Sequence, residues 1–377
     1  MSNDPILVVV FLRGGADGLN LISPTADVDY IAARPEEMRV LRKGDEAGHA
    51  MADMAADVDF RFHPQARGLS ELYNAGEMAV IHASGLTDGT RSHFDAEAKM
   101  ERAAVSGAAG GWLGRWFASQ QLDGILPLLS VGSAPDSVRG AHDVAVAENL
   151  EDLIMAQGAD LAPIIRQRLL KSLGQHPLLG APIRRLVQLS STLQSQIIDA
   201  DGEVKSYTPR VDYPESDLAG AFKTIARSIK LGLGLRVATL DFGGWDTHED
   251  QTATFGNNVD RLSSSLLAFW RDLGNDAERV NVVVMSEFGR RLRANTSGGT
   301  DHGYGNAMMV LGAGVNGGRM LGDWPGLAND ALDDRADLAI TTDYRHVLAE
   351  VMGQHMVAEN IAALFPAFTA EPIGLYA

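Results

Sequence analysis

The sequence predicts an α/β protein in which a doubly wound, mostly parallel sheet is flanked by helices on both faces. The first observation is a set of short, continuous apolar runs rich in β-branched residues, which is typical of strands buried on both faces. The second is that segments with helical periodicity lie between these runs, as in sheets whose strands are joined by helices. The third is a hydrophobic fraction of 45% in 377 residues, which is enough to bury a sizeable core.

Six apolar runs that end near Gly, Asp or Ser are the predicted strands: Ile6–Leu12, Met78–Ala83, Ile125–Val131, Arg236–Phe242, Val280–Ser286 and Ala307–Leu311. Two helices are predicted between them. One covers His93–Ala104, with Ser92 as its N-cap and acidic residues in its first turn. The other covers Thr252–Leu273, has apolar residues at helical spacing and ends before Gly274.

The segment Asp143–Ser206 breaks this alternation, because it has helical periodicity and almost no strand signal. Pro and Gly around His176–Pro182 divide it, which predicts a helical hairpin inserted on the sheet as a cap. Its arginines are interpreted as a solvated face and not as a binding patch: Arg166, Arg168, Arg184 and Arg185. The proline-containing stretch Tyr207–Ser216 is the return linker. We therefore expect residues 1–377 to form one domain, with 143–206 as an insertion.

The composition excludes several classes of function. The chain has no Cys, so any metal must be held by Asp, Glu, His or hydroxyl oxygens. With 32 Lys and Arg against 49 Asp and Glu, the formal charge of −17 argues against non-specific binding to nucleic acid or to an anionic membrane. The first apolar run is too short to span a bilayer, and no signal peptide is evident at the start. As read, the chain is expected to be cytoplasmic.

Unusual polar clusters accompany the ends of the predicted strands. Four of them follow a strand, and a fifth precedes the last one: Arg13–Asn20, Asp88–Phe94, Asp241–His248, Ser286–Arg290 and Gly299–Gly303. In open α/β sheets, ligands bind in the crevice beyond the carboxyl ends of the strands. If the sheet is parallel, the first four clusters should therefore converge there.

The contents of these clusters indicate a metal site. Asp246 and His248 are two residues apart and can project to one side of an extended loop, whereas Asp301 and His302 are adjacent and can reach a common centre. Hard oxygen ligands are added by two further carboxylates, Asp17 and Glu287. Such a set fits Zn, Mn, Fe or Mg better than copper or an iron–sulfur cluster. Two metals about 4 Å apart could clamp a phosphoryl or sulfuryl oxygen and activate a nucleophile.

Several of these residues also fit structural roles, which the sequence leaves open. Asp17 fits an ordinary turn. Ser92 fits a helix cap as well as a nucleophile at the positive end of a helix. His93 fits a structural or supporting role as well as a catalytic one. Three arginines either hold a substrate or pair with nearby carboxylates: Arg13, Arg91 and Arg290.

Taken together, the motifs resemble the bacterial domain of unknown function 1501 family, in the right order and over nearly the whole chain. The motifs are Phe11–Asn20, Arg91–Phe94, Gly243–His248, Met285–Arg290 and Gly299–Gly303. The stretch Thr341–Arg345 resembles the closing segment of the family. That family is itself similar to the alkaline phosphatase and sulfatase superfamily. The resemblance implies an alkaline-phosphatase-like α/β fold and a two-metal ester hydrolase site.

The resemblance also implies roles for individual residues. Asp17 would bind one metal, and Ser92 would be the nucleophile at a helix start, with Thr90 as the alternative. The ligands implied near the middle and last strands are Asp246, His248 and His302, with Asp301 as an extra carboxylate. Where the superfamily usually has an adjacent Asp-His pair, this chain has Glu287-Phe288, so a ligand histidine is missing there.

This departure separates two metal positions. The first keeps Asp246, His248 and His302, a set that suits Zn. The second would hold Mg, Mn or Ca through oxygen ligands only: Asp17, Glu287 and Ser92. Alternatively, this second position would be empty.

The leading hypothesis is a metal-dependent hydrolase or transferase that acts on a small anionic phosphate or sulfate ester with one or two divalent ions. Ser92 would attack in line while Arg13 or Arg91 holds the non-bridging oxygens. The alternative, motivated by Glu287-Phe288, is a catalytically impaired protein that binds a metal or a partner and retains the fold. Neither nucleic acid nor a membrane span is expected, and the sequence specifies no oligomeric state. Relatives often carry a twin-arginine export signal, which makes the periplasm the alternative compartment.

Overall fold

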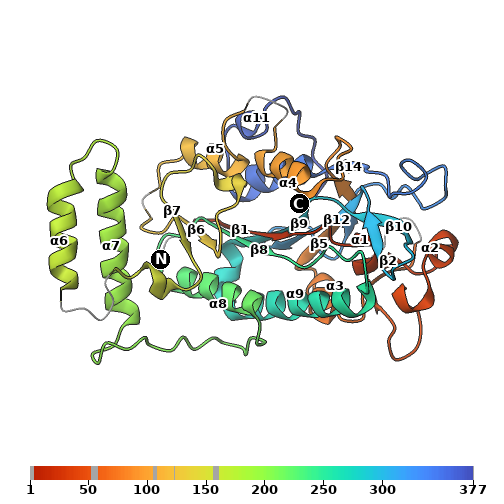
Figure 1. The fold of residues 1–377 in the computed structure, drawn as a ribbon, viewed down its shortest axis with the longest axis horizontal. Coiled ribbons are helices and arrows are strands. Elements are labelled where there is room, and N and C mark those ends of the chain that lie inside the picture. The colour runs from red at the N-terminus through yellow and green to blue at the C-terminus, as the bar shows by residue number, and fades with distance from the viewer. Residues whose placement is uncertain (1–3, 52–57, 105–107, 123, 156–160, 377) are drawn as a thin grey trace.

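A central sheet lies between two layers of helices (Figure 1) in a computed structural model that describes residues 4–51, 58–104, 108–122, 124–155 and 161–376. Its nine strands are β1 (Ile6–Leu12), β5 (Met78–Gly85), β6 (Leu128–Val131), β7 (Val144–Ala147), β8 (Val237–Phe242), β9 (Val280–Ser286), β12 (Asn306–Gly312), β13 (Met320–Leu321) and β14 (Thr342–Asp343). Eight of them follow the order β13-β5-β12-β9-β1-β8-β6-β7, and β14 pairs with β5. β12 is antiparallel to both of its neighbours, and the other pairings are parallel.

Helices cover both faces of the sheet. They are α1 (Gly18–Leu21), α2 (Val28–Ala33), α3 (Arg67–Asn74), α4 (His93–Arg102), α5 (Trp112–Ser119), α6 (Ala162–Leu173), α7 (Gly180–Ile197), α8 (Asp217–Lys230), α9 (Gln251–Leu273), α10 (Tyr344–Glu350) and α11 (Ile361–Leu364). Val8 and Val10 of β1 pack in a core with α3, α8 and α9, whereas Leu7 and Val9 pack in a second core with α4, α5 and α10. The predicted doubly wound, mostly parallel α/β fold is therefore confirmed.

The direction of β12 explains how five polar clusters reach one edge of the sheet. Strands β1, β5, β8 and β9 run the same way, so their carboxyl ends lie at the same edge. Because β12 runs the opposite way, its amino end lies at that edge too. The cluster before β12 contains β11 (Thr300–His302), which pairs with β10 (Arg290–Ala294) in a separate two-stranded sheet. Another small sheet has three strands, in the order β2 (Ile22–Pro24), β4 (Phe60–Phe62) and β3 (His49–Ala50).

Local chemistry shifts some of the expected boundaries. β1 and β9 have the predicted ends, but β6 begins at Leu128 and not at Ile125. Pro127 precedes it and has no N–H to donate to a neighbouring strand. Its carbonyl oxygen accepts from the backbone N–H groups of residues 236 and 237 at 2.9 and 3.1 Å. Helix α4 ends at Arg102 because Ala103 adopts a left-handed conformation with φ of 47°.

The segment Asp143–Ser206 contains a strand that the sequence analysis missed. β7 adds to the edge of the main sheet, parallel to β6, and three of its four residues are only partly buried or exposed. Its sequence, Val-Ala-Val-Ala, is apolar but only four residues long, and half of it is alanine, which is depleted in strands, so periodicity alone does not distinguish it from a helix segment. Residues 156–160 of the segment lie outside the described residues.

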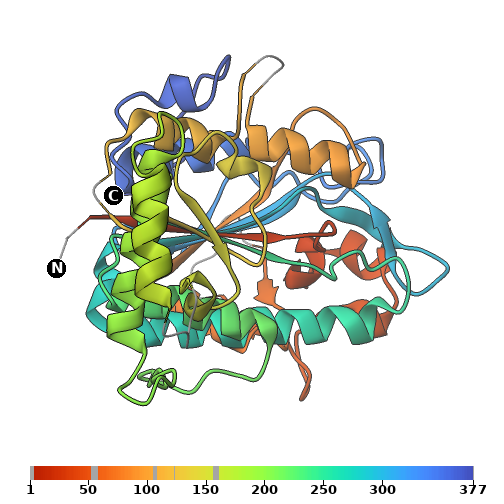
Figure 2. The same cartoon turned by 60° about the vertical axis from the view of Figure 1, so that its left-hand side comes forward.

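Helices α6 and α7 of this segment form a hairpin at one end of the molecule (Figure 1, Figure 2). α7 packs on the body through buried apolar side chains: Val187, Leu189, Leu193 and Ile197. The stretch after it, Tyr207–Ser216, runs back to α8 without helix or strand. Its Tyr207 and Tyr213 hydroxyls donate to the carboxylate of Asp272 on α9 at 2.6 and 3.0 Å.

Candidate metal centre

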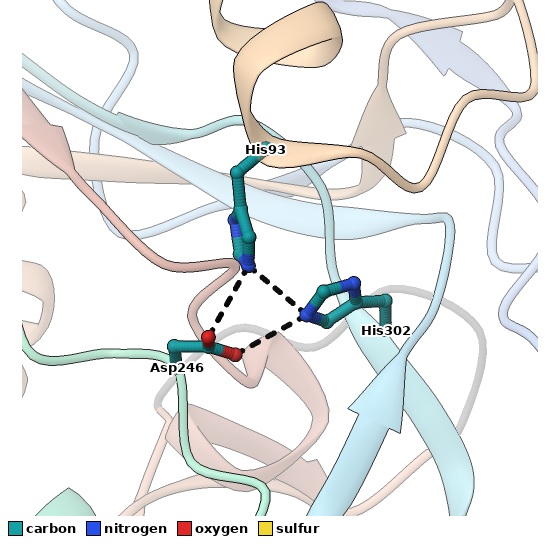
Figure 3. A group of neighbouring side chains, drawn as sticks. All are labelled: His93, Asp246 and His302. Carbon is teal, nitrogen blue, oxygen red and sulfur yellow. Dashed lines mark hydrogen bonds and ion pairs between the residues drawn. The ribbon is translucent and has the colours of Figure 1, made fainter.

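Three imidazole rings and one carboxylate converge at the edge of the sheet. His93 is the first residue of α4, His302 ends β11, and Asp246 and His248 lie in the loop after β8. The Nε2 atom of His302 lies 3.0 Å from Nε2 of His93 and 2.9 Å from Nε2 of His248. Asp246 lies beside all three rings, with its carboxylate oxygens 3.4 Å from His93, 3.1 Å from His248 and 3.2 Å from His302. Figure 3 shows Asp246 with two of them, His93 and His302.

The other ring nitrogen of each histidine faces an acceptor. His93 Nδ1 lies 2.6 Å from Glu287 Oε1, His302 Nδ1 lies 2.9 Å from the carbonyl oxygen of Arg91, and His248 Nδ1 lies 3.3 Å from Asp301 Oδ1. We assign the proton of each neutral ring to Nδ1, because none of these oxygens can donate. The Nε2 lone pairs are then directed toward one another, and such lone pairs repel unless a cation or a proton lies between them.

A divalent metal fits this donor set. Imidazole nitrogen and carboxylate oxygen are zinc ligands, and bonds of about 2.0–2.1 Å in a tetrahedral site place the ligand atoms about 3.3 Å apart. The separations among His93, His302 and Asp246 are 3.0, 3.2 and 3.4 Å. The donor atoms of these three residues lie within 4.8 Å of one another, and His248 contacts two of the three. Acceptors behind the rings are the usual arrangement that orients ligating histidines.

Arg290 positions the carboxylate of Asp246. Its buried guanidinium donates to Asp246 Oδ1 at 2.6 Å and also to the carbonyl oxygens of Gly14, Gly15 and Thr300. Burial opposes the ionisation of Asp246, but the hydrogen bond and the charge of Arg290 lower its pKa to about 2. Asp246 is therefore ionised at neutral pH, with Oδ2 facing His93.

Glu287 and Phe288 stand where the resemblance would place an Asp-His pair. Glu287 is buried, and its Oε1 accepts from the N–H groups of Gly14 and Gly15 at 2.8 and 2.9 Å as well as from His93. The hydrogen bond that His93 donates to Glu287 raises the pKa of His93. The ring of Phe288 packs against the rings of His93 and His302, with centroids 4.8 and 4.9 Å apart. The third imidazole of the cluster thus comes from His93 on α4.

Asp17 is held by other partners. Its two oxygens accept from both terminal nitrogens of Arg34 at 2.7 and 3.1 Å, and Oδ2 also accepts from Gln251 at 2.7 Å. Among the described residues, the groups of donors close enough to share an ion do not include Asp17. Those groups include a second set in which Glu97 joins His93 and Glu287.

The residues expected to act on the substrate lie around this cluster. Ser92 occupies the N-cap position of α4 and is exposed, but its side chain makes no capping hydrogen bond. The Arg13 guanidinium pairs with Glu101, Asp241 and Glu97. The Arg91 guanidinium pairs with Asp337 and, at 3.4 Å, with Asp333.

Sequence reasoning named most of this cluster but missed two features. It gave His93 no role as a ligand, although His93 follows a strand-end loop directly and begins a helix, a signal that could have found it. It also missed the buried pair of Arg34 with Asp17 and the contact with Gln251. Nothing in the sequence around Arg34 marks it as the partner of Asp17.

Comparison with known proteins places the chain in a class. The model of the family described as "Protein of unknown function (DUF1501)" matches residues 5–360, so the chain belongs to this family. A comparison with curated protein sequences gives no match. No helix of the described residues is both long and apolar enough to cross a membrane.

A comparison with solved structures finds similar chains at low similarity. The C-terminal periplasmic domain of EcEptC from Escherichia coli, in complex with Zn, is 7% identical, with a TM-score of 0.39 over 83% of this chain and 74% of that chain. The PsFucS1 sulfatase from Pseudoalteromonas sp. is 11% identical, with a TM-score of 0.35 over 84% and 64%. A protein in the alkaline phosphatase superfamily from Vibrio parahaemolyticus is 9% identical, with a TM-score of 0.36 over 83% and 61%.

Proposed function

We propose that the protein is a zinc-dependent hydrolase or transferase of a phosphate or sulfate ester. The observation that carries the proposal is the convergence of the Nε2 atoms of His93, His248 and His302 beside the ionised Asp246. Each ring is oriented by an acceptor behind it, so the set is organised before any ion binds. A chain with a formal charge of −17 repels anions, whereas a bound cation attracts them. The proposed substrate class is therefore a small anionic ester, which the metal centre attracts.

The residues of the chain have separate roles in this proposal. The ion is held by His93, His302 and Asp246. The fourth ligand is His248, which contacts two of these three residues. The bound ion would supply Lewis-acid polarisation of an ester oxygen. Ser92, exposed at the start of α4 next to His93, is the proposed nucleophile. Its hydroxyl oxygen forms the bond to phosphorus or sulfur while the ester oxygen leaves, and the hydroxyl proton passes to the leaving alcohol or to solvent.

The arginines can contact the substrate only by exchanging partners. Arg13 is surrounded by three carboxylates, and Arg91 is paired with the buried carboxylate of Asp337. A non-bridging oxygen of the substrate would have to replace one of these carboxylates. The proposal therefore assigns ester binding first to the metal centre and only second to Arg13 or Arg91.

The second candidate function is a protein that binds a metal ion but does not catalyse ester cleavage. Specific contacts favour this second reading. Asp17 is neutralised by Arg34, so it offers no free charge to a second ion. The expected oxyanion-binding arginines are already paired. In this reading the centre with His93, His302 and Asp246 binds one ion and has a structural or partner-binding role.

Metal content and turnover distinguish these readings. The purified full chain is analysed for bound metals and then assayed with aryl phosphates, phosphodiesters and aryl sulfates, with and without added Zn²⁺, Mn²⁺ and Mg²⁺. The proposal predicts bound zinc and turnover of at least one ester class. Ser92→Ala should abolish turnover and retain zinc, whereas Ser195→Ala, an exposed serine on α7, should change neither.

Three results would each contradict a part of the proposal. Zinc binding without turnover of any ester supports the second reading. Turnover that is unchanged in Ser92→Ala removes Ser92 as the nucleophile, and the absence of bound metal under every condition rejects the metal centre itself.

A further inference from the structure

The α6–α7 hairpin has a charge opposite to that of the rest of the chain. Residues 161–198 include five basic side chains and no acidic one: Arg166, Arg168, Lys171, Arg184 and Arg185. The whole chain has a formal charge of −17, so the acidic excess resides outside the hairpin. Arg185 pairs with Asp143 and Arg166 donates to Gln194, whereas Arg168, Lys171 and Arg184 are exposed.

The hairpin also carries most of the exposed large apolar side chains of the described residues. Seven of the thirteen lie between residues 161 and 198: Leu161, Ile164, Ile165, Leu170, Leu178, Leu179 and Leu186. Leu178 and Leu179, in the connection between the helices, have exposed fractions of 81% and 46%. A cluster of exposed leucine and isoleucine of this kind marks an interaction surface more often than an ordinary protein exterior.

On α6 the apolar and basic side chains share one face. Leu161 precedes the helix, and Ile164, Ile165 and Arg168 follow it at intervals of three, four and seven residues, which places all four on the same side. Only Ala162 of this helix is buried. α6 packs on α7 and not on the sheet, and it is the outermost element at that end of the molecule (Figure 1, Figure 2). The described part of the chain provides nothing that covers this face.

The net charge of the whole chain argues against binding to an anionic membrane, and the hairpin arginines were expected to be a solvated face, but the local charge of the hairpin is positive. We propose that the α6–α7 hairpin docks the protein on a lipid bilayer surface with anionic headgroups. Exposed leucine and isoleucine enter the interface, and the basic side chains contact the headgroups, as in amphipathic helices that lie at membrane surfaces. α6 packs on α7, and two packed helices together are about 20 Å thick, which exceeds the screening length of about 8 Å at physiological salt. The acidic body is therefore screened from a surface that the hairpin contacts.

A second copy of the chain is a poorer occupant of this face. Two hairpins packed together would place five positive charges opposite five others, with no acidic residue on either one.

Docking on lipid also agrees with the position of the metal centre. The hairpin lies at the end of the molecule opposite to β10 and β11, so a docked protein keeps His302 away from the bound surface (Figure 1).

Vesicle co-sedimentation of the full chain tests this inference. One set of vesicles contains phosphatidylcholine alone, and the other also contains phosphatidylglycerol. We expect binding to the anionic vesicles, little to the neutral ones, and loss of binding at high salt because headgroup attraction is screened. Arg168→Gln with Lys171→Gln should weaken binding about tenfold or more. Leu178→Ser with Leu179→Ser should weaken it at least as much.

Controls keep the result specific to the hairpin. Val28→Ser and Val357→Ser remove exposed apolar side chains elsewhere and should leave binding unchanged. All variants are compared by circular dichroism and melting temperature, and their mass is measured by analytical ultracentrifugation. The inference is overturned by equal binding to neutral vesicles, by binding that the hairpin substitutions leave intact, or by no binding at all. A dimer that these substitutions dissociate, without vesicle binding, would assign the face to a second copy instead.

Discussion

At the scale of single residues, each imidazole of the metal centre depends on an acceptor behind it. Behind His93 this acceptor is Glu287, one of whose oxygens accepts from His93 and from two backbone N–H groups. An amide in its place would keep an acceptor but lose the charge that favours ligation by His93. We expect Glu287→Gln to lower zinc affinity about 10–100-fold in a calorimetric titration.

The matched control for this substitution is Glu278→Gln, which makes the same chemical change at an exposed position. It should leave the zinc affinity unchanged. An affinity for zinc in Glu287→Gln equal to that of the wild type would show that the contact with His93 does not support the centre.

A second prediction at this scale concerns a histidine buried outside the metal centre. Nδ1 of His82 accepts from the N–H of Ala83 at 2.9 Å, so its Nε2–H donates to the carbonyl oxygen of Ile22 at 3.1 Å. Burial lowers the pKa of His82 to about 4, below the value near 6.5 of the unfolded chain. The unfolded state therefore binds the proton first as the pH falls.

The stabilisation from neutral His82 is present above pH 6.5 and is lost progressively between pH 6.5 and 4. From pH 7.5 to pH 5 this amounts to about 2 kcal/mol of unfolding free energy. Urea unfolding of His82→Gln should show a shallower dependence on pH by that amount. His142→Gln, at an exposed position, should follow the wild type. An equally steep dependence in His82→Gln would assign the acid lability to other groups.

Residue types and their order along the chain were sufficient to predict that Asp246, His248 and His302 lie close together, because these residues follow or precede strands that end at one edge. They were not sufficient for Asp17. A carboxylate after a strand can bind an ion or pair with a cation, and the choice depends on Arg34, which reaches it only in the folded chain. The same limit applies to His93, whose direction is fixed by Glu287, 194 residues further along.

At the scale of elements, Asp272 on α9 fixes the linker that returns from the hairpin. Its buried carboxylate pairs with Lys230 and accepts from the hydroxyls of Tyr207 and Tyr213 and from the N–H of Arg210. We expect Asp272→Ala to lower the unfolding free energy by about 3 kcal/mol, because one partner of a buried ion pair and the acceptor of three further hydrogen bonds are removed together.

The same substitution should speed tryptic cleavage near Lys205 and Arg210, since the linker loses its attachment to α9. Asp276→Ala is the matched control, because Asp276 lies four residues away and pairs with nearby Arg279. Cleavage in the linker at the rate of the wild type would show that Asp272 does not hold it.

Strand positions were predicted more reliably than strand directions. The ends of β1 and β9 follow directly from their continuous apolar runs, since both strands are buried on both faces. The antiparallel direction of β12 cannot be read from such a run, because burial is the same in either direction. The edge strand β7 was missed because its apolar run is only four residues long and half alanine, which does not distinguish a strand from part of a helix.

At the scale of the whole molecule, the metal centre should couple to global stability. An ion that binds only the folded chain stabilises it by about 2.7 kcal/mol at a concentration one hundred times its dissociation constant. For a chain of this length we expect a rise of about 3 °C in melting temperature on addition of Zn²⁺, and EDTA should reverse it. Asp246→Asn should abolish the rise, whereas Asp212→Asn, at an exposed position, should preserve it.

Composition also fixes part of the chemistry at this scale. The absence of Cys leaves nitrogen and oxygen ligands as the only choice, and the structure brings such ligands together from three separate stretches of the chain. The most direct test of this centre is anomalous scattering at the zinc edge, measured on crystals of the full chain. The account predicts one strong peak between His93 Nε2, His302 Nε2 and the carboxylate of Asp246. No peak there, or a peak only beside Asp17, would contradict it.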